Sequence, residues 1–385
     1  MKIVLVMDQH YTSEAKARST KLIPTLWATR YVEGLKRRGH EVTVIAPGEP
    51  DEGKVCVPEV KWPFFVKPII EQQDAIFGVC DEKTVRAAFK GADIVHLEMP
   101  FKLCVNARKL ADEMGIPCIA SFHCQPENIA YNSGMKYLPL LPDILYRWMR
   151  RRIFDHVSHV HCPTEFIASE LKKHRFKAKM DVVSNGTDAV FRVMDVEKPP
   201  EWKDKFVIIM VGRLNPEKRQ DLIIKAVMRS KYADRIQLVL PGRGHRAKAY
   251  ERLGRKLKNR PIFGFFGKEK LAELLNQCDL YVHAAEVEIE AVACVEAFSC
   301  GLVPVIADAP KSATRFFALD ERCLFKKGSS KDLCSKIEYM IEHPEEKAKL
   351  RELYLEKAEE YRIPRIVEQM ERVYETVIKE KKKGV

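Results

Sequence analysis

Short apolar runs alternate along this chain with segments whose apolar residues recur every three or four positions. The short runs are typical of buried strands, and the longer spacing is typical of helices with one buried face. The predicted strands are Lys2–Met7, Glu41–Ala46, Asp93–Leu97, Pro117–Phe122, Val157–His161, Met180–Val183, Phe206–Val211, Ile236–Leu240, Ile262–Phe265, Leu280–His283 and Val303–Ala307. Strands that alternate with helices predict a doubly wound α/β fold with parallel sheets.

The alternation is interrupted around Met194–Trp202, where the sequence becomes polar and contains prolines. A chain of 385 residues is longer than one ordinary core usually holds, so two domains are expected. We predict one Rossmann-like domain over residues 1–195, a second over residues 196–360, and a C-terminal helix in residues 361–385 that packs back on the first domain. Two such domains side by side leave a cleft, and parallel sheets bind ligands at the carboxyl ends of their strands.

Composition limits the class of protein. The apolar fraction of 46% is typical of a globular protein, and no apolar run approaches the ~20 residues that span a bilayer. The first apolar run ends at Asp8, too early for a signal peptide. Eleven cysteines without a C-x-x-C pair predict reduced core thiols in a cytosolic protein. The net charge of +12 favours an anionic partner such as a nucleotide, a nucleic acid or a lipid surface.

Two carboxylates in one apolar segment are the first candidates for chemistry. Residues 288–301 read E-I-E-A-V-A-C-V-E-A-F-S-C-G. We predict a largely buried helix from Ala291, with Glu288 on the loop before it and Glu296 on its second turn. Acidic residues seldom enter such surroundings unless they are paired or hold a ligand. The alternative is that Glu288 caps the helix and Glu296 faces solvent.

Polar groups after other predicted strands give further candidates. Gly212, Arg213 and Lys218 form a glycine turn with two cations before a helix, a pattern suited to a diphosphate, although it could also be a solvated basic loop. His123 follows the strand that ends near Ser121, where a lone histidine is most often structural. A G-x-G-x-x-G motif does not follow the first strand, and Gly242-Arg243-Gly244 is too short a match, which argues against a dinucleotide enzyme.

Three of these elements match one family together. The sequence resembles the retaining GT-B glycosyltransferases of glycosyltransferase family 4, which share an E-x7-E motif. The spacing of Glu288 and Glu296 is that motif, Val211–Lys218 matches V-G-R-L-x-x-E-K, and Asn185–Asp188 is a variant of N-G-[IV]-D. The resemblance covers nearly the whole chain. It implies two Rossmann-like domains that face each other across a cleft, the first binding the acceptor and the second the sugar nucleotide.

The resemblance also implies roles for individual residues. Gly212, Arg213 and Lys218 would bind the diphosphate of the sugar nucleotide, and Glu296 would accept hydrogen bonds from the ribose. The catalytic residues would be Glu288, facing the donor sugar, and His123, contacting that sugar from the first domain. Fixed cations can neutralise the leaving diphosphate, so we expect no metal and no cofactor, only a sugar nucleotide as co-substrate.

The chain departs from the family pattern in three places. The loop after the first strand has Thr12–Lys16 where the family often has Gly-Gly, so the sequence does not predict a close approach of that backbone to a phosphate. Ile289 and Glu290 replace a small residue and an aromatic one. Position 98, where the family often has His or Gln, is Glu98.

One segment bears on the acceptor. Ser121–Asn132 is similar to the H-x-Q-P-E-N-I-x-Y-N run of bacterial diacylglycerol glucosyltransferases. Apolar and basic residues then alternate over residues 136–152, among them Trp148, Arg150, Arg151 and Arg152. A basic amphipathic helix with a tryptophan suits the headgroup plane of an anionic membrane. The alternative is a core helix with a solvated basic face.

The sequence therefore predicts a cytoplasmic glycosyltransferase associated peripherally with the inner face of the cell membrane. It would move a hexose, in the first instance glucose from UDP-glucose, onto a lipid such as diacylglycerol. One alternative is the same chemistry on a soluble sugar or a polysaccharide. Another is a nucleic-acid-binding protein, which the dispersal of the cations along helices argues against. No nucleic-acid partner is expected.

Overall fold

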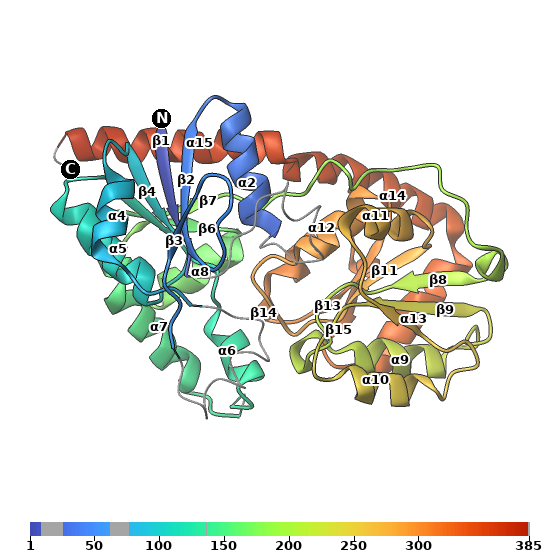
Figure 1. The fold of residues 1–385 in the computed structure, drawn as a ribbon. Helices are drawn as coiled ribbons and strands as arrows, with labels where there is room; N and C mark the ends of the chain where they lie inside the picture. The colour runs from blue at the N-terminus through green and yellow to red at the C-terminus, as the bar shows by residue number, and fades with distance from the viewer. Residues whose placement is uncertain (9–25, 62–76, 136, 384–385) are drawn as a thin grey trace. The chain divides into compact units, whose positions relative to one another are not determined.

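The structure is a computed structural model that describes residues 1–8, 26–61, 77–135 and 137–383, with only the backbone of residues 26 and 27 (Figure 1). The chain divides into two compact units. The first unit contains Met1–Pro126, Pro139–Asn185 and Ile363–Val385, and the second contains Glu127–Leu138 and Gly186–Arg362.

The first unit is built on a parallel sheet of seven strands in the order β3-β2-β1-β4-β5-β6-β7. The strands are β1 (Lys2–Val6), β2 (Glu41–Pro47), β3 (Lys54–Val57), β4 (Ile94–Leu97), β5 (Cys118–Ser121), β6 (His159–Cys162) and β7 (Lys179–Val182). The strand order reverses between β1 and β4, the place where open α/β sheets bind ligands.

Helices cover both faces of this sheet. They are α2 (Leu26–Arg37), α4 (Glu82–Phe89), α5 (Lys102–Glu113), α7 (Leu141–Arg152), α8 (Glu165–Lys173) and α15 (Ile363–Lys382). The C-terminal helix α15 lies beside α2, and both pack on the face of β1 that carries Ile3 and Leu5 (Figure 1). Helices α4 and α5 pack against each other away from this cluster.

The second unit is built on a parallel sheet of six strands in the order β10-β9-β8-β11-β13-β15. They are β8 (Phe206–Ile209), β9 (Ile236–Pro241), β10 (Ile262–Gly264), β11 (Leu280–His283), β13 (Pro304–Asp308) and β15 (Leu324–Lys326). Two short strands, β12 (Val287–Glu288) and β14 (Lys311–Ser312), pair separately.

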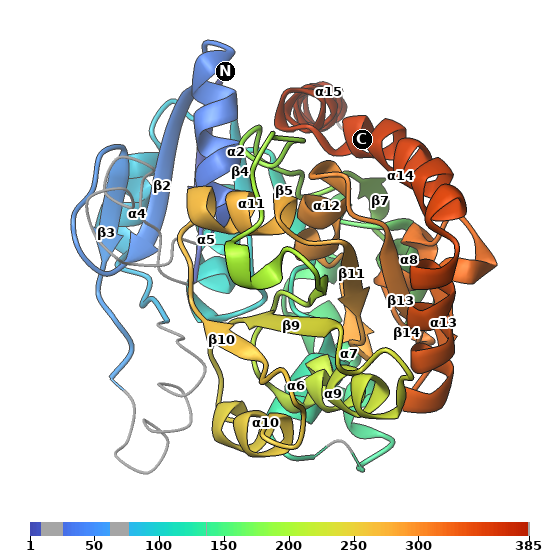
Figure 2. The ribbon, with the colours of Figure 1, turned by 90° about the vertical axis from the view of Figure 1, so that its right-hand side faces the viewer.

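Helices α9 (Gln220–Arg229), α10 (Ala247–Gly254) and α13 (Ser330–Glu342) pack together on one side of this sheet. On the other side lie α11 (Lys268–Asn276) and α12 (Val292–Ser299), with α14 (Pro344–Ala358) against α12 (Figure 2). Both units are thus doubly wound and Rossmann-like, which confirms the predicted fold class.

The units differ from the domain ranges expected from the sequence. Residues 186–195 and 127–138 cluster with the second unit. The polar segment Met194–Trp202 packs on that unit: the backbone N–H of Met194 donates to Asn276 Oδ1 at 2.8 Å, and Trp202 is buried. The interruption at Met194–Trp202 is therefore part of the second unit, and the buried ring of Trp202 adds apolar contact there.

The eleven cysteines are all free thiols in the described part of the chain, and eight of them are buried. Their placement is that of core residues, as predicted. Within the described ranges, none of the helices has both the length and the apolar character needed to cross a membrane.

Candidate functional site

Two glycine loops meet backbone to backbone at the carboxyl ends of β8 and β9. Gly212 and Gly242 have φ values of +155° and +154°, which L side chains rarely adopt. A Cβ atom on Gly242 would lie 1.9 Å from the carbonyl oxygen of Gly212. The backbone N–H of Leu214 donates to the carbonyl of Arg243 at 2.8 Å. Only glycine fits at this crossing, so Gly242-Arg243-Gly244, set aside as a partial dinucleotide motif, shapes the predicted diphosphate loop.

The two cations of this loop differ in their surroundings. The side chain of Arg213 is 53% exposed and lies 3.7 Å from a carboxylate oxygen of buried Glu217. Lys218 ends a 3-10 turn, is mostly buried, and forms an ion pair with Oε1 of Glu288. The loop thus presents one exposed guanidinium and one ammonium that is already paired with a carboxylate.

Glu288 is a buried carboxylate held by two partners. It lies on β12, and its Oε1 atom contacts both the ammonium of Lys218 and, at 3.2 Å, Nε2 of His283. Burial acts to raise the pKa of Glu288, but Lys218 and His283 outweigh it and lower the pKa to about 2. Glu288 is therefore ionised at neutral pH, with its orientation fixed.

His283 is a site residue that the sequence reasoning did not single out. It ends β11, and its Nδ1 atom lies 3.1 Å from the hydroxyl of Tyr281. Burial lowers the pKa of His283, so the ring is neutral. Because Nε2 faces a carboxylate, that nitrogen carries the proton and Nδ1 accepts from Tyr281. The sequence did contain a signal for His283, because it is a histidine at the end of a predicted strand, five positions before Glu288.

Glu296 lies on the second turn of α12, as predicted. The helix starts after Ala291, whose backbone is left-handed at φ 61°, and Ala291 offers no side-chain cap. Glu288 and Glu296 are 8% and 6% exposed. The alternative in which Glu288 caps the helix and Glu296 faces solvent is therefore wrong.

A third carboxylate, Glu286, anchors helix α6 (Pro126–Asn132) to the second unit. The hydroxyl of Tyr131 donates to Glu286 Oε2 at 2.6 Å, and Arg219 pairs with the other oxygen. Burial opposes ionisation of Glu286, but Tyr131 and Arg219 lower its pKa overall. A second contact joins Lys311 to Glu127 at 3.1 Å. Part of the run that resembles lipid glycosyltransferases is therefore packed beside the candidate donor site.

His123 lies in the first unit, two residues after β5. Its Nε2 atom is 3.2 Å from Oε2 of Glu98, which is almost fully buried. Burial lowers the pKa of His123 to about 3, so the ring is neutral. His123 is thus a partly buried hydrogen-bonding group.

Helix α7 has two distinct faces. Tyr146 and Met149 are buried, so one side of the helix faces the core, as in the alternative of a core helix. Leu140, Ile144 and Trp148 are 68%, 58% and 40% exposed and recur every fourth residue. The outward face is therefore apolar as well as basic, not simply a solvated basic face.

The arginines of α7 divide between these faces. Arg147, Arg151 and Arg152 are exposed. Arg150 is half-buried and donates to the backbone carbonyl of His174 at 3.2 Å, with Asp155 Oδ2 at 3.3 Å. The expectation that Arg150 faces a membrane is wrong, because its guanidinium binds the protein. Lys136 and the loop Thr12–Lys16 lie outside the described residues.

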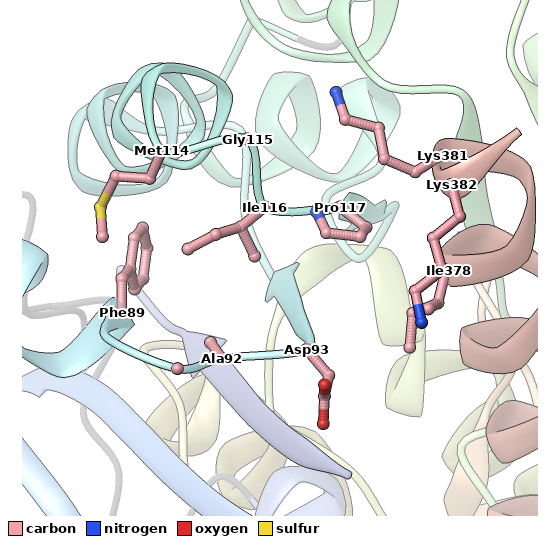
Figure 3. Close-up of a pocket in the computed structure, with 11 residues that line it drawn as sticks. Phe89, Ala92, Asp93, Met114, Gly115, Ile116, Pro117, Ile378, Lys381 and Lys382 are labelled. Carbon is pink, nitrogen blue, oxygen red and sulfur yellow. The ribbon is translucent and has the colours of Figure 1, made fainter. Parts of the chain in front are cut away.

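A hollow lies at the opposite edge of the first sheet, where β4 and β5 begin (Figure 3). Phe89, Met114 and Ile116 form its apolar end, and Lys381 and Lys382 of α15 point along its other side. The hollow is lined by none of the residues singled out from the sequence. Ligands of parallel sheets bind at the carboxyl ends of strands, so we assign this hollow no role.

Two glycosyltransferase family models match the chain, one in each half. Residues 27–191 match the model "Glycosyltransferase Family 4", and residues 194–356 match "Glycosyl transferases group 1". A GDP-mannose-dependent alpha-mannosyltransferase of Corynebacterium glutamicum is 28% identical over 72% of this chain and 66% of its own length. An alpha-monoglucosyldiacylglycerol synthase of Streptococcus pneumoniae is 23% identical over 71% of this chain and 65% of its own length. The matches thus span about two thirds of each relative.

Solved structures share the fold. Anabaena HepE in complex with UDP and glucose aligns with a TM-score of 0.72 at 16% identity, covering 98% of this chain and 100% of that one. Sucrose-phosphate synthase of Thermosynechococcus elongatus gives a TM-score of 0.72 at 15% identity, covering 98% and 99%. At these identities the likeness shows the fold alone.

Proposed function

We propose that this chain transfers a hexose from a sugar nucleotide to a membrane lipid, with retained configuration. The chain is a glycosyltransferase of the GT-B fold with domains of the group 1 and family 4 type. UDP-glucose and diacylglycerol are the donor and acceptor that we put first. The observation that carries the proposal is the contact of Lys218 and His283 with Glu288, next to the two glycine loops.

The loops would bind the diphosphate. Gly212 and Gly242 carry no side chain, although their own N–H groups donate to the carbonyls of Pro241 and Gly264. Exposed Arg213 and the ammonium of Lys218 supply two positive charges for the diphosphate. As the bond between the anomeric carbon and the diphosphate oxygen breaks, negative charge grows on that oxygen, where fixed cations stabilise it most. These cations are why we propose a reaction without metal or cofactor. Glu296 would accept hydrogen bonds from the ribose hydroxyls.

Glu288 would act on the sugar. Positive charge develops at the anomeric carbon as the diphosphate leaves, and an ionised, oriented carboxylate stabilises it. His283 would hold Glu288 in place when a diphosphate competes for Lys218. From the first unit, we assign His123 a hydrogen bond to the same sugar, as the resemblance implies.

The outward face of α7 supports a lipid acceptor. Leu140, Ile144 and Trp148 are exposed on one face, and Arg147 and Arg151 flank it, an arrangement suited to an anionic interface. One relative is named as a glucosyldiacylglycerol synthase. We therefore propose peripheral binding to the inner face of the cell membrane, from the cytoplasm.

The same chemistry on a soluble sugar or a polysaccharide is the second candidate. The relative that depends on GDP-mannose also makes the guanosine nucleotide a donor to test. We do not propose nucleic-acid binding, since both halves of the chain match glycosyltransferase models.

The test is a transfer assay with UDP-glucose, UDP-galactose, GDP-mannose and ADP-glucose, each with diacylglycerol in anionic vesicles or with soluble sugars, with and without EDTA. We expect an α-linked glucolipid from UDP-glucose that EDTA does not abolish. Glycosylation of soluble sugars alone would replace the lipid proposal. Strict dependence on added Mg²⁺ or Mn²⁺ would overturn the metal-free reaction, and no transfer or donor hydrolysis with any nucleotide would overturn the proposal as a whole.

A further inference from the structure

A continuous chain of buried hydrogen bonds runs through the first unit behind His123. Its contacts are His161 Nε2 to the carbonyl of Val183 (2.7 Å), Ser121 Oγ to His161 Nδ1 (2.8 Å), His96 Nε2 to Ser121 Oγ (2.6 Å), His96 Nδ1 to the Tyr374 hydroxyl (2.7 Å), and the Tyr31 hydroxyl to that of Tyr374 (2.8 Å). These groups come from α2, β4, β5, β6 and α15. These hydrogen bonds therefore connect the C-terminal helix α15 to the strands of the sheet next to His123.

One carbonyl sets the direction of every proton in this chain. The carbonyl of Val183 can only accept, so Nε2 of His161 carries the proton and, in a neutral ring, Nδ1 accepts. The hydroxyl of Ser121 must then donate to His161 and accept from Nε2 of His96. By the same step, Nδ1 of His96 accepts from Tyr374. Every N–H or O–H donor in this series of hydrogen bonds therefore already has its acceptor within the series.

The rings are neutral because they are buried together. Burial, with the neighbouring histidines, lowers the pKa of His96 well below its ordinary value, and burial lowers that of His161 to about 3. The ring centroids of His96 and His123 lie 5.8 Å and 5.4 Å from that of His161. Asp181, on β7, is the charged group that acts on His161, and it does not reverse the shift.

Glu98 lies against this chain but receives no proton from it. Its side chain is 2% exposed, and in the described part of the chain neither carboxyl oxygen accepts a well-formed hydrogen bond. Nε2 of His96 is 3.6 Å away and already donates to Ser121, whose own proton goes to His161. A buried carboxylate without donors is costly, so Glu98 is better described as the neutral acid. Burial raises the pKa of Glu98 well above its ordinary value, and the smaller lowering effect of the nearby Ser121 hydroxyl does not reverse this shift.

We propose that Glu98 is a positioning residue whose carboxylic acid donates a hydrogen bond to Nε2 of His123 and so fixes the ring proton on Nδ1. The contact is the 3.2 Å separation of Glu98 Oε2 and His123 Nε2. In this state the Nδ1–H group of His123 is a neutral donor, and the ring is not a cation. The role in transfer rests on the proposed function, in which His123 bonds a hydroxyl of the donor sugar.

The direct test is nitrogen NMR of the full chain with ¹⁵N-labelled histidine, with the His123 signals identified by their loss in His123→Ala. We expect a neutral His123 ring at pH 7 that carries its proton on Nδ1. Glu98→Gln should keep that form, since its amide also donates, whereas Glu98→Leu should shift the ring toward the Nε2–H form. His161 should carry its proton on Nε2 in every variant and serves as the internal control. A His123 ring in the wild-type chain that is charged, or protonated on Nε2, would overturn the proposal.

Kinetics separate positioning from a structural role. Glu98→Leu should lower kcat roughly 10- to 100-fold, since a misoriented contact costs that much, with unchanged UDP affinity because UDP carries no hexose. Glu98→Gln should recover kcat to within about threefold of wild type. If both variants melt like wild type and transfer at wild-type rates, Glu98 does not position His123. If the wild-type chain transfers no sugar at all, the proposed function fails while the NMR result still decides the Glu98 contact.

Discussion

Lys218 and Glu288, seventy positions apart, form an ion pair in which the carboxylate also contacts His283. The resemblance assigned these two residues to different parts of the donor, the diphosphate and the hexose. In the structure they are partners of each other. A diphosphate that binds the ammonium of Lys218 would therefore compete with Glu288, while His283 keeps the carboxylate in place.

This competition predicts opposite effects of Glu288→Gln on binding and turnover. Without the carboxylate, Lys218 is fully available and a negative charge next to the diphosphate is gone, so UDP should bind roughly 3- to 10-fold more tightly, about 1 kcal/mol. Turnover should fall on the order of 100-fold, because the charge that stabilises the developing cation is lost. Calorimetry with UDP and initial rates measure the two effects. Glu342→Gln, which removes a carboxylate paired with Lys231 on the surface, is the matched control and should change neither. Weaker UDP binding in Glu288→Gln would contradict the competition.

The same pair predicts how stability depends on pH. The pKa of Glu288 is lowered to about 2, below its unfolded value, so its contribution is complete above the unfolded pKa and is lost as the pH falls through the folded one. The window is therefore about pH 4.5 down to 2, and the loss is about 3 kcal/mol of unfolding free energy. Urea unfolding of the wild type and of Glu288→Gln between pH 7 and 3 should show a shallower acid limb in the variant. Parallel limbs would mean that the pair does not lower the pKa.

Glu296→Gln should act on donor and product alike. If buried Glu296 accepts the ribose hydroxyls, the amide loses charge-assisted hydrogen bonds of ~1.5–3 kcal/mol. The donor KM and the Kd for UDP should both rise roughly tenfold or more, with a smaller change in kcat. The ribose is common to substrate and product, so unchanged UDP affinity would remove Glu296 from the ribose site.

Sequence patterns predicted eleven of the thirteen strands described in the two sheets and missed β3 and β15. β3 and β15 are edge strands with only one buried residue each, Val57 and Phe325, so their sequences lack the apolar signal of a central strand. β12 has two residues, too few for any period. The paired glutamates and the Arg213–Lys218 loop were found because their spacing within one segment is short.

Other site features depend on contacts between distant segments. Gly242 matters because its backbone meets that of Gly212, thirty positions earlier, and nothing in either loop alone indicates this. The hydrogen bond of Tyr131 to Glu286 joins residues 155 positions apart. Arg150 looks like its neighbours in sequence, and it is distinguished by contacts with the backbone carbonyls of His174 and Arg175 and with Asp155.

Gly242→Ala should disrupt the glycine crossing. The new Cβ would lie 1.9 Å from a backbone oxygen, and φ is +154°, so both sterics and backbone strain oppose it. We expect a loss of ~3 kcal/mol or more in unfolding free energy and no detectable UDP binding. Gly267→Ala is the matched control, since a Cβ there meets nothing within 4 Å and φ is −64°. Equal thermal stability of the two variants would show that the loops do not meet as described.

The outward face of α7 predicts two separable components of membrane binding. Replacing Leu140, Ile144 and Trp148 by Ser removes apolar area, so binding to neutral and anionic vesicles should fall together. Replacing Arg147 and Arg151 by Ser should weaken binding only to anionic vesicles, by about 1 kcal/mol per charge at low salt, since screening acts over ~8 Å at physiological ionic strength. Vesicle sedimentation at several salt concentrations measures both.

Two controls make this last prediction specific to α7. Lys83→Ser with Lys109→Ser removes the same charge from other exposed sites of the first unit and should leave vesicle binding nearly unchanged. Arg150→Ser should instead lower thermal stability, because the guanidinium bonds the backbone at His174 and Arg175 and pairs with Asp155. If the lysine pair weakens binding as much as the arginine pair, net charge alone attracts the membrane and α7 is not the contact. If Arg150→Ser melts like wild type and loses vesicle binding, its side chain faces the lipid after all.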